Sequence, residues 1–235
     1  MKTIIAFALA ALSVPLPAAP ANEARGRQLL AEARAACGGA AWDTIVGWHE
    51  RGVISRAGRP DGPYEEWSAI TALAMAMRIE SNGAVVSFTG SDATSYWRVL
   101  PSGAIDAGSA PGPLRLHARD AFLSNFAYFL PGRFPATVTA RDARTVGGAV
   151  YDVVSVAPAA AEGFDLWIDR ASHHVARFVV GDQVAELRNY RTVAGVCAPT
   201  IAIQSDGDLA HTTTIHVDSV DTSPLPNSVF APPSR

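Results

Sequence analysis

Residues 164–200 read FDLWIDRASHHVARFVVGDQVAELRNYRTVAGVCAPT, and this stretch indicates the fold class of the chain. Residues 164–169 alternate between apolar side chains and other side chains, as in a strand that buries one face. A turn then leads to strand-like runs at 175–180 and 184–193. The stretch therefore predicts a β-meander of three consecutive antiparallel strands.

The same period of two recurs on both sides of this stretch. Ser81-Asn82-Gly83 is a hairpin signal between two of the runs. Together the runs predict roughly ten strands. Outside the opening stretch they cover residues 45–54, 64–79, 85–99, 136–143, 149–157, 200–204 and 212–217.

Two segments have the period of a helix instead. Residues 23–36 place apolar side chains on one face and are followed by Gly38-Gly39, which ends a helix. Residues 114–130 contain neither Gly nor Pro, and Phe122, Phe126 and Phe129 fall on one helical face. We expect a mainly β fold with α elements. It is a single curved antiparallel sheet, or half-open β-barrel, that wraps a central helix and carries an N-terminal helix.

The first residues have the pattern of a secretory signal peptide. Lys2 precedes an apolar run at 4–14, and Ala19-Pro20-Ala21 supplies small residues at a cleavage site. We expect residues 1–21 to be removed after Ala21, which leaves residues 22–235 as one β-barrel domain in the periplasm. The apolar run is too short to span a bilayer as a helix, and no later apolar run in the chain is long enough either.

The composition of the chain indicates a globular protein and argues against nucleic-acid binding. The chain of 235 residues is 49% hydrophobic and 17% charged, which is typical of a packed globular domain. The formal net charge of −3 supplies no basic field for nucleic acid or for an anionic membrane surface. We therefore expect no nucleic-acid partner.

Cys37 and Cys197 are the two cysteines of the chain. In an oxidising compartment they are a candidate disulfide, which would close a long loop and stabilise the fold by roughly 5 kcal/mol on a chain-entropy model. Two separate buried thiols are the alternative. Neither cysteine has a second Cys or a His at the spacing of a zinc site.

No pattern of catalytic or metal-binding residues emerges. His173 and His174 are adjacent, and His211 and His216 are five apart, so each pair points to opposite faces of a strand. Glu65-Glu66 splays apart in the same way, and no Gly-x-Ser-x-Gly nucleophile elbow occurs. We expect no enzyme activity, no cofactor and no metal.

An excess of large apolar side chains is the remaining signal. An ordinary filled core would explain these residues, but a barrel of this size can also enclose an apolar cavity. Met and aromatic side chains suit a site that accepts varied acyl chains. On that hypothesis the concave face and its covering helix contribute Trp67, Met75, Met77, Ile79, Phe88, Trp97, Val99, Phe122, Phe126 and Phe129.

Four places resemble a known family. They are Gly38-Gly39-x-x-Trp42, the run 164–169, the pattern Asn189-Tyr190-Arg191-x-Val193-x-Gly195-x-x-x-Pro199, and Phe230 with Pro232 and Pro233 near the end. In these residues the chain resembles the periplasmic lipoprotein-carrier and outer-membrane lipoprotein-sorting superfamily, an unclosed β-barrel with a helical lid. The resemblance implies a non-catalytic periplasmic carrier whose partner is a lipid or an acylated lipoprotein. The alternatives are an envelope scaffold that binds a partner protein without a ligand cavity, and a hydrolase of unrecognised geometry.

Overall fold

The structure is a computed structural model that describes residues 20–233. The predicted signal peptide therefore lies almost wholly outside the described residues, and its cleavage after Ala21 stays a prediction. Within the described range, no helix combines the length and the apolar character that a membrane crossing requires.

One antiparallel sheet of thirteen strands is the main element of the described chain. Its order is β6-β5-β4-β3-β2-β1-β13-β12-β11-β10-β9-β8-β7, so β6 and β7 are edge strands and the sheet is not closed. This confirms the predicted fold class, with more strands than expected. The strands are β1 Trp48–Arg56, β2 Arg59–Ala69, β3 Ala74–Ser81, β4 Ala84–Ser91, β5 Tyr96–Val99, β6 Ile105–Gly108, β7 Ala136–Val146, β8 Ala149–Pro158, β9 Phe164–Asp169, β10 Val175–Val180, β11 Gln183–Val193, β12 Val196–Ser205 and β13 Thr213–Asp221.

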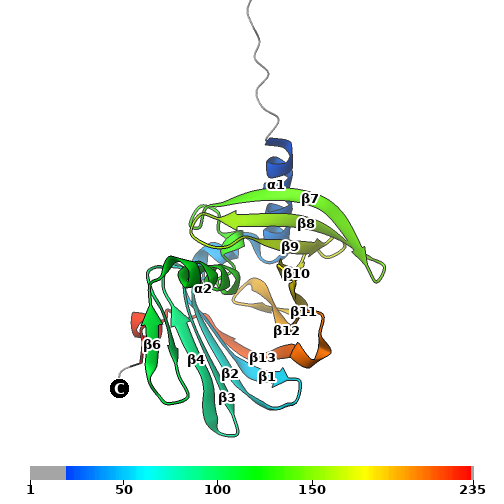
Figure 1. Cartoon of the computed structure of the whole chain (residues 1–235). Coiled ribbons are helices and arrows are strands. Elements are labelled where there is room, and N and C mark those ends of the chain that lie inside the picture. The colour runs from blue at the N-terminus through cyan, green and yellow to red at the C-terminus, as the bar shows by residue number, and fades with distance from the viewer. Residues whose placement is uncertain (1–19, 234–235) are drawn as a thin grey trace, which may run out of the picture.

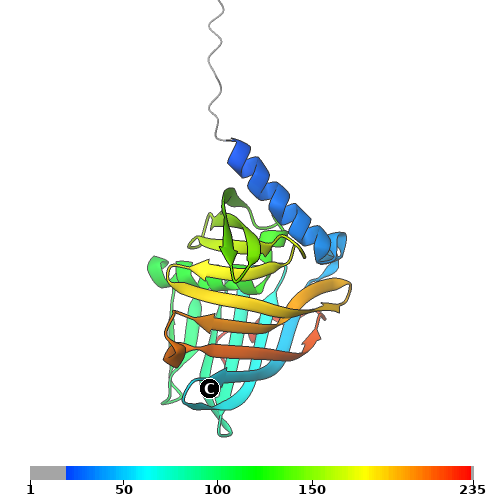
Figure 2. The ribbon, with the colours of Figure 1, turned by 90° about the vertical axis from the view of Figure 1, so that its right-hand side faces the viewer.

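The sheet curls around the helical segment that connects its two halves. Figure 1 shows helix α2 (Pro111–Ser124) between the part of the sheet formed by β1–β6 and the part formed by β7–β9. Figure 2 shows the strands that join these parts, β10–β13, in yellow to red across the front. Helix α1 (Pro20–Ala36) packs against β7 and β8. The concave face of the sheet is therefore covered by α2, while α1 covers the end at β7.

Gly38 allows α1 to end against the sheet. Its φ of 104° lies in the left-handed region, and a Cβ at this position would lie 2.3 Å from the carbonyl oxygen of Gly195. Only glycine permits both this conformation and this close approach. The chain then enters a 3-10 turn, η1 (Gly39–Thr44), which buries Trp42 completely.

The prediction of one continuous helix over 114–130 is wrong. α2 ends at Ser124, Phe126 has a left-handed φ of 50°, and a short 3-10 helix, η2 (Ala127–Phe129), follows. The physical reason is Asn125, whose side-chain Nδ2 donates hydrogen bonds to the carbonyl oxygens of Ala69 (2.9 Å) and Ala72 (2.6 Å). These bonds hold the chain at the β2–β3 turn, so Phe122, Phe126 and Phe129 do not share a helical face.

An aromatic cluster fills the interior beside α1. The ring of Phe126 lies 4.8 Å from that of Trp42 and 5.3 Å from that of Trp48, measured between centroids. Phe129 contacts Trp42 at 5.6 Å. These rings join apolar side chains of α1 and β7–β12 in the largest buried cluster of the described residues. This part of the interior is a filled core.

Cys37 and Cys197 form a disulfide, which confirms that candidate pairing. Their Cα atoms lie 4.7 Å apart across a sequence separation of 160 residues. The N–H of Cys197 also donates to the carbonyl oxygen of Cys37 at 3.2 Å. The end of α1 is thus attached both covalently and by a backbone hydrogen bond to the start of β12.

The double variant Cys37→Ala/Cys197→Ala should unfold at lower denaturant concentration than the oxidised wild type. Removing a link across so long a loop is expected to lower the free energy of unfolding by about 2 to 5 kcal/mol. Urea titrations with and without a reducing agent measure the loss, and the double variant should not respond to the reductant. Equal stability of the wild type in both conditions would contradict the structural role of the bond.

Candidate functional site

A cavity of about 400 Å³ lies between the concave face of the sheet and the C-terminal end of α2. Its walls come from β1, β2, β3, β10, β12 and β13, and its cover comes from the segment 120–126. Met75, Met77 and Ile79 of β3 lie on one wall, and Ile215 of β13 lies on another. This volume is within the range of small-molecule binding sites.

The covering segment is fixed to the rest of the molecule at both ends. Its C-terminal end is held by Asn125 at the β2–β3 turn, and Arg133 Nη1 donates to the carbonyl oxygen of Ile70 at 2.8 Å. At the other end, Arg115 Nη2 donates to the carbonyl oxygen of Ala161 at 2.7 Å, and Arg119 pairs with Glu162 at 3.4 Å. A few polar contacts therefore position α2 over the cavity.

The structure brings four of the expected lining residues together. Met75, Met77, Ile79 and Phe126 contact the cavity. Three other expected lining residues lie elsewhere, as the strand register shows. Trp67 is paired with Ala76, Phe88 with Arg78, and Trp97 with Gly90, which itself faces Ala76. Ala76 and Arg78 alternate with the methionines on β3, and alternate residues of a strand point to opposite faces. All three belong to the face opposite the methionines. The expected single apolar lining is thus divided between two faces of the sheet.

The other face is covered by the C-terminal segment. Trp67, Phe88 and Val99 pack with Trp97 and Phe230 in a separate apolar cluster. Trp97 Nε1 donates a hydrogen bond to the carbonyl oxygen of Phe230 at 2.7 Å. These residues hold the chain end against the sheet and do not contact the cavity.

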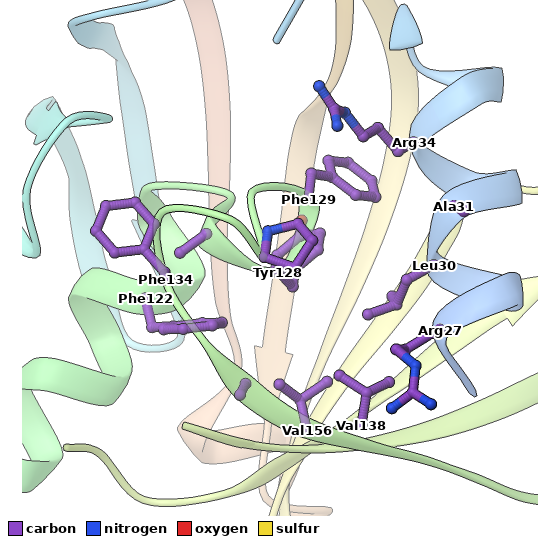
Figure 3. A pocket seen from close by; sticks show the side chains of 13 residues that line it. Arg27, Leu30, Ala31, Arg34, Phe122, Tyr128, Phe129, Phe134, Val138 and Val156 are labelled. Carbon is purple, nitrogen blue, oxygen red and sulfur yellow. The ribbon is translucent and has the colours of Figure 1, made fainter. Parts of the chain in front are cut away.

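Phe122 and Phe129 contact a second, smaller pocket of about 150 Å³ between α1 and the helical connection. Figure 3 shows their rings on the side of the connection, with Leu30 of α1 and Val138 and Val156 of the sheet around them. Its two arginines are already paired, because Arg27 contacts Glu23 at 3.2 Å and Arg34 contacts Asp43 at 2.7 Å. This pocket is an apolar gap beside the core.

Two acidic side chains interrupt the apolar lining of the large cavity. Glu50 of β1 and Glu66 of β2 are direct cross-strand partners, and both contact the cavity. Trp48 Nε1 donates to Glu50 Oε1 at 2.7 Å, and the Tyr64 hydroxyl donates to Glu66 Oε2 at 2.8 Å. Each carboxyl group is thus oriented by an aromatic side chain two residues earlier on its own strand.

Burial and proximity make this pair difficult to ionise. Burial, and next the charge of Glu66, raise the pKa of Glu50 to about 8. Burial also raises the pKa of Glu66. Opposed like charges on neighbouring strands destabilise a sheet, and desolvation favours the neutral acid. Near neutral pH the pair therefore retains at least one proton.

The sequence alone did not reveal this pair. Glu65 and Glu66 were the candidates for paired carboxylates, but Glu65 lies on the other face of β2 and pairs with Arg51 at 3.2 Å. The available signal was the repeated pattern aromatic-x-Glu, in Trp48-x-Glu50 and Tyr64-x-Glu66, on two strands joined by a hairpin. Recognising it required the register that places Glu50 opposite Glu66.

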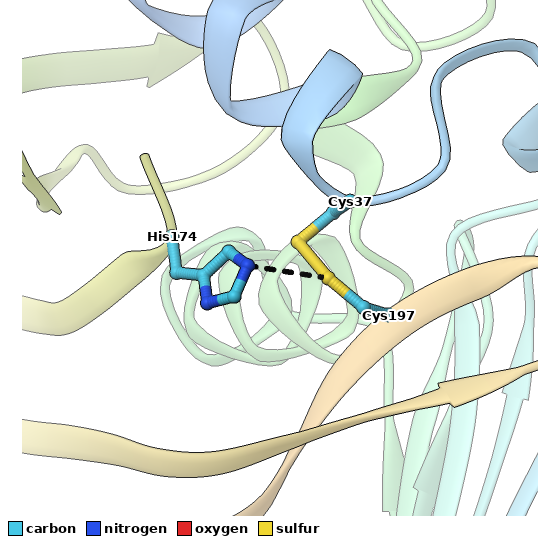
Figure 4. Close-up of side chains that lie close together, drawn as sticks. All are labelled: Cys37, His174 and Cys197. Atoms are coloured by element: carbon cyan, nitrogen blue, oxygen red, sulfur yellow. Dashed lines mark hydrogen bonds between the residues drawn. A yellow bond between two sulfur atoms is a disulfide. The ribbon is translucent and has the colours of Figure 1, made fainter. Parts of the chain in front are cut away.

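His174 lies beside the disulfide. Its Nε2 atom is 3.7 Å from Cys197 Sγ (Figure 4). Its ring stacks on that of Tyr190 with 4.3 Å between centroids. Burial lowers the pKa of His174. Because the two sulfur atoms are bonded to each other, neither is a thiolate that could act with this imidazole as a metal ligand.

The acidic pair should make the stability of the protein depend on pH. Since the pKa of Glu50 rises from 4.5 to about 8 on folding, the free energy of unfolding should fall as the pH increases through this interval. Each unit of pKa shift corresponds to about 1.4 kcal/mol. In Glu50→Gln the free energy of unfolding should fall less over this interval, and the variant should be more stable than the wild type near pH 8. Urea titrations across the interval measure this.

Glu65→Gln is the matched control, because this side chain lies on the opposite face and the variant should keep the wild-type pH profile. A wild-type stability that does not change between pH 5 and pH 8 would show that Glu50 is not held as a neutral acid.

No protein-family model and no curated protein sequence matches the chain. Solved structures do resemble it. A candidate outer membrane lipoprotein-sorting protein domain from Vibrio parahaemolyticus matches with a TM-score of 0.60 at 11% identity, over 89% of this chain and 97% of that one. A LolA superfamily protein from Nitrosomonas europaea matches with a TM-score of 0.60 at 14% identity, over 88% and 97%.

A DUF1329 family protein from Desulfovibrio piger matches with a TM-score of 0.57 at 12% identity, over 89% of this chain and 97% of that one. Similarity at such low identity concerns the fold alone. It confirms the fold that the sequence resemblance implied: the chain shares the fold of these solved structures, and its own sheet is curved and unclosed.

Proposed function

We propose that the protein is a non-catalytic periplasmic carrier that binds an apolar ligand, either a lipid or the acyl chains of a lipoprotein, in the cavity beneath α2. The cavity of about 400 Å³ is the observation that carries this proposal, because it is large enough for a ligand and is bordered by Met75, Met77 and Ile79. The fold shared with a lipoprotein-sorting domain supports it. The alternative, an envelope scaffold that binds a partner protein, assumed that the molecule contains no ligand cavity.

The energetics are sufficient for reversible carriage. Burying about fifteen methylenes at about 0.8 kcal/mol each yields roughly 12 kcal/mol. Loss of translational and rotational freedom removes at least about 4 kcal/mol, so the dissociation constant is micromolar at its tightest. Such a ligand can be loaded and released without covalent chemistry. The flexible thioethers of Met75 and Met77 tolerate chains of different shape.

The two ends of α2 are held to the rest of the molecule with different firmness. The first residues of α2 are exposed to solvent, while Ala121 and Phe122 near its end are buried. The contacts of Arg115 and Arg119 with the β8–β9 loop involve partly exposed side chains, whereas Asn125 is fully buried. The N-terminal half of α2 is therefore the more easily displaced part of the helix, while Asn125 keeps the end that borders the cavity attached.

A variant that fills the cavity should lose ligand. Ala202 of β12 borders the cavity, and Ala202→Trp places an indole in the space that the ligand would occupy. We expect its affinity for the neutral fluorescent probe N-phenyl-1-naphthylamine to fall by about tenfold or more, since even a few lost apolar contacts remove over about 1.4 kcal/mol. Fluorescence titration measures the change.

Val85→Trp is the control, because Val85 is exposed on β4 and its variant should bind the probe as the wild type does. Equal affinity of Ala202→Trp and the wild type would mean that the probe does not bind in this cavity. Absence of binding to the wild type would contradict the carrier proposal.

A further inference from the structure

We propose that the Glu50–Glu66 pair makes the cavity selective for an amphiphile whose polar end is a cationic nitrogen, an alkylammonium group. This inference rests on the proposed function, because it assigns a polar subsite to the same cavity. It concerns the chemical class of the ligand, which the fold does not determine.

The geometry is that of a receptor for one small polar group. Glu50 and Glu66 lie directly opposite each other on β1 and β2, and both side chains border the cavity. Trp48 holds Glu50 Oε1 and Tyr64 holds Glu66 Oε2, so neither carboxyl group needs to reorganise to receive a ligand. Glu66 Oε1 also accepts a hydrogen bond from the Ser68 hydroxyl at 3.3 Å. An ammonium group has the N–H donors to reach both carboxyl groups at once.

The charges around the pair favour a cation and disfavour an anion. The ionisable residues that border the cavity are Glu50, Arg56, Tyr64, Glu66 and Asp120. Asp120 is already paired with Arg119 at 2.8 Å. Arg56 lies six positions along β1 from Glu50, a distance of about 20 Å in a strand. No described basic group bordering the cavity therefore compensates the two opposed carboxyl groups, and a carboxylate or phosphate head group would meet repulsion there.

Binding of the cation should be coupled to loss of a proton from the pair. A positive charge between the carboxyl groups favours their ionised forms and lowers the pKa of Glu50 from its raised value of about 8. Affinity should therefore increase with pH up to about that value. An alkylammonium, like a lysine side chain, stays charged to about pH 10. The apolar tail would lie along Met75 and Met77.

The test compares three ligands with the same tail, namely decylammonium, decanol and decanoate, below their micelle-forming concentrations. Each displaces N-phenyl-1-naphthylamine from the wild type, from Glu50→Gln/Glu66→Gln and from Glu65→Gln as the matched surface control. For the wild type near pH 8 we expect decylammonium to bind about tenfold tighter than decanol, with decanoate weakest. The double variant should bind all three within about threefold of one another.

Equal binding of decylammonium and decanol to the wild type would overturn the head-group assignment and leave the carrier proposal intact. An ammonium preference that persists in the double variant would also overturn it. Failure of all three ligands and of the naphthylamine probe to bind would contradict the carrier proposal itself, and this inference with it.

A second readout does not depend on folding of the double variant. Titration calorimetry of the wild type near neutral pH, in buffers of different ionisation enthalpy, should detect proton release with decylammonium and none with decanol. Equal proton release for the two ligands would contradict the role of the acidic pair.

Discussion

The hydrogen bonds of the Asn125 side chain to the β2–β3 turn determine how the interior of this protein is divided. They end α2, and the left-handed residue that follows directs the ring of Phe126 toward Trp42 and Trp48. On the α1 side of this point the space is filled with aromatic and aliphatic side chains. On the other side a cavity of about 400 Å³ remains beneath the helix. One buried amide thus separates a filled core from a cavity.

The two parts of the interior also differ in chemistry. The filled core is attached to α1 by the Cys37–Cys197 disulfide. The cavity, by contrast, contains a pair of opposed glutamates whose burial raises their pKa values. Placing two partly buried acids opposite each other reduces stability, so structural need does not explain them. Retaining them in a ligand-sized space is consistent with recognition of a polar group on an otherwise apolar ligand.

The sequence predicted the architecture well and the site only in part. Apolar alternation specified most strands, because a half-buried strand imposes a period of two whatever its neighbours are. The residue at which α2 ends could not be predicted from the sequence, because it depends on contacts between Asn125 and backbone groups more than fifty positions away. The predicted lining combined residues of two faces for a related reason: Trp67 and Met77 are both large apolar side chains, but strand register places them on opposite faces of the sheet. Recognising Glu50 and Glu66 as a pair also required knowledge of the strand register.

The most direct test of the central claim, that the space beneath α2 holds an apolar ligand, is native mass spectrometry of the protein released from its host envelope without detergent. The account predicts a species heavier than the polypeptide by the mass of one lipid or acylated molecule, which organic extraction removes and identifies. A single species with the mass of the polypeptide alone, and an extract free of lipid, would contradict it.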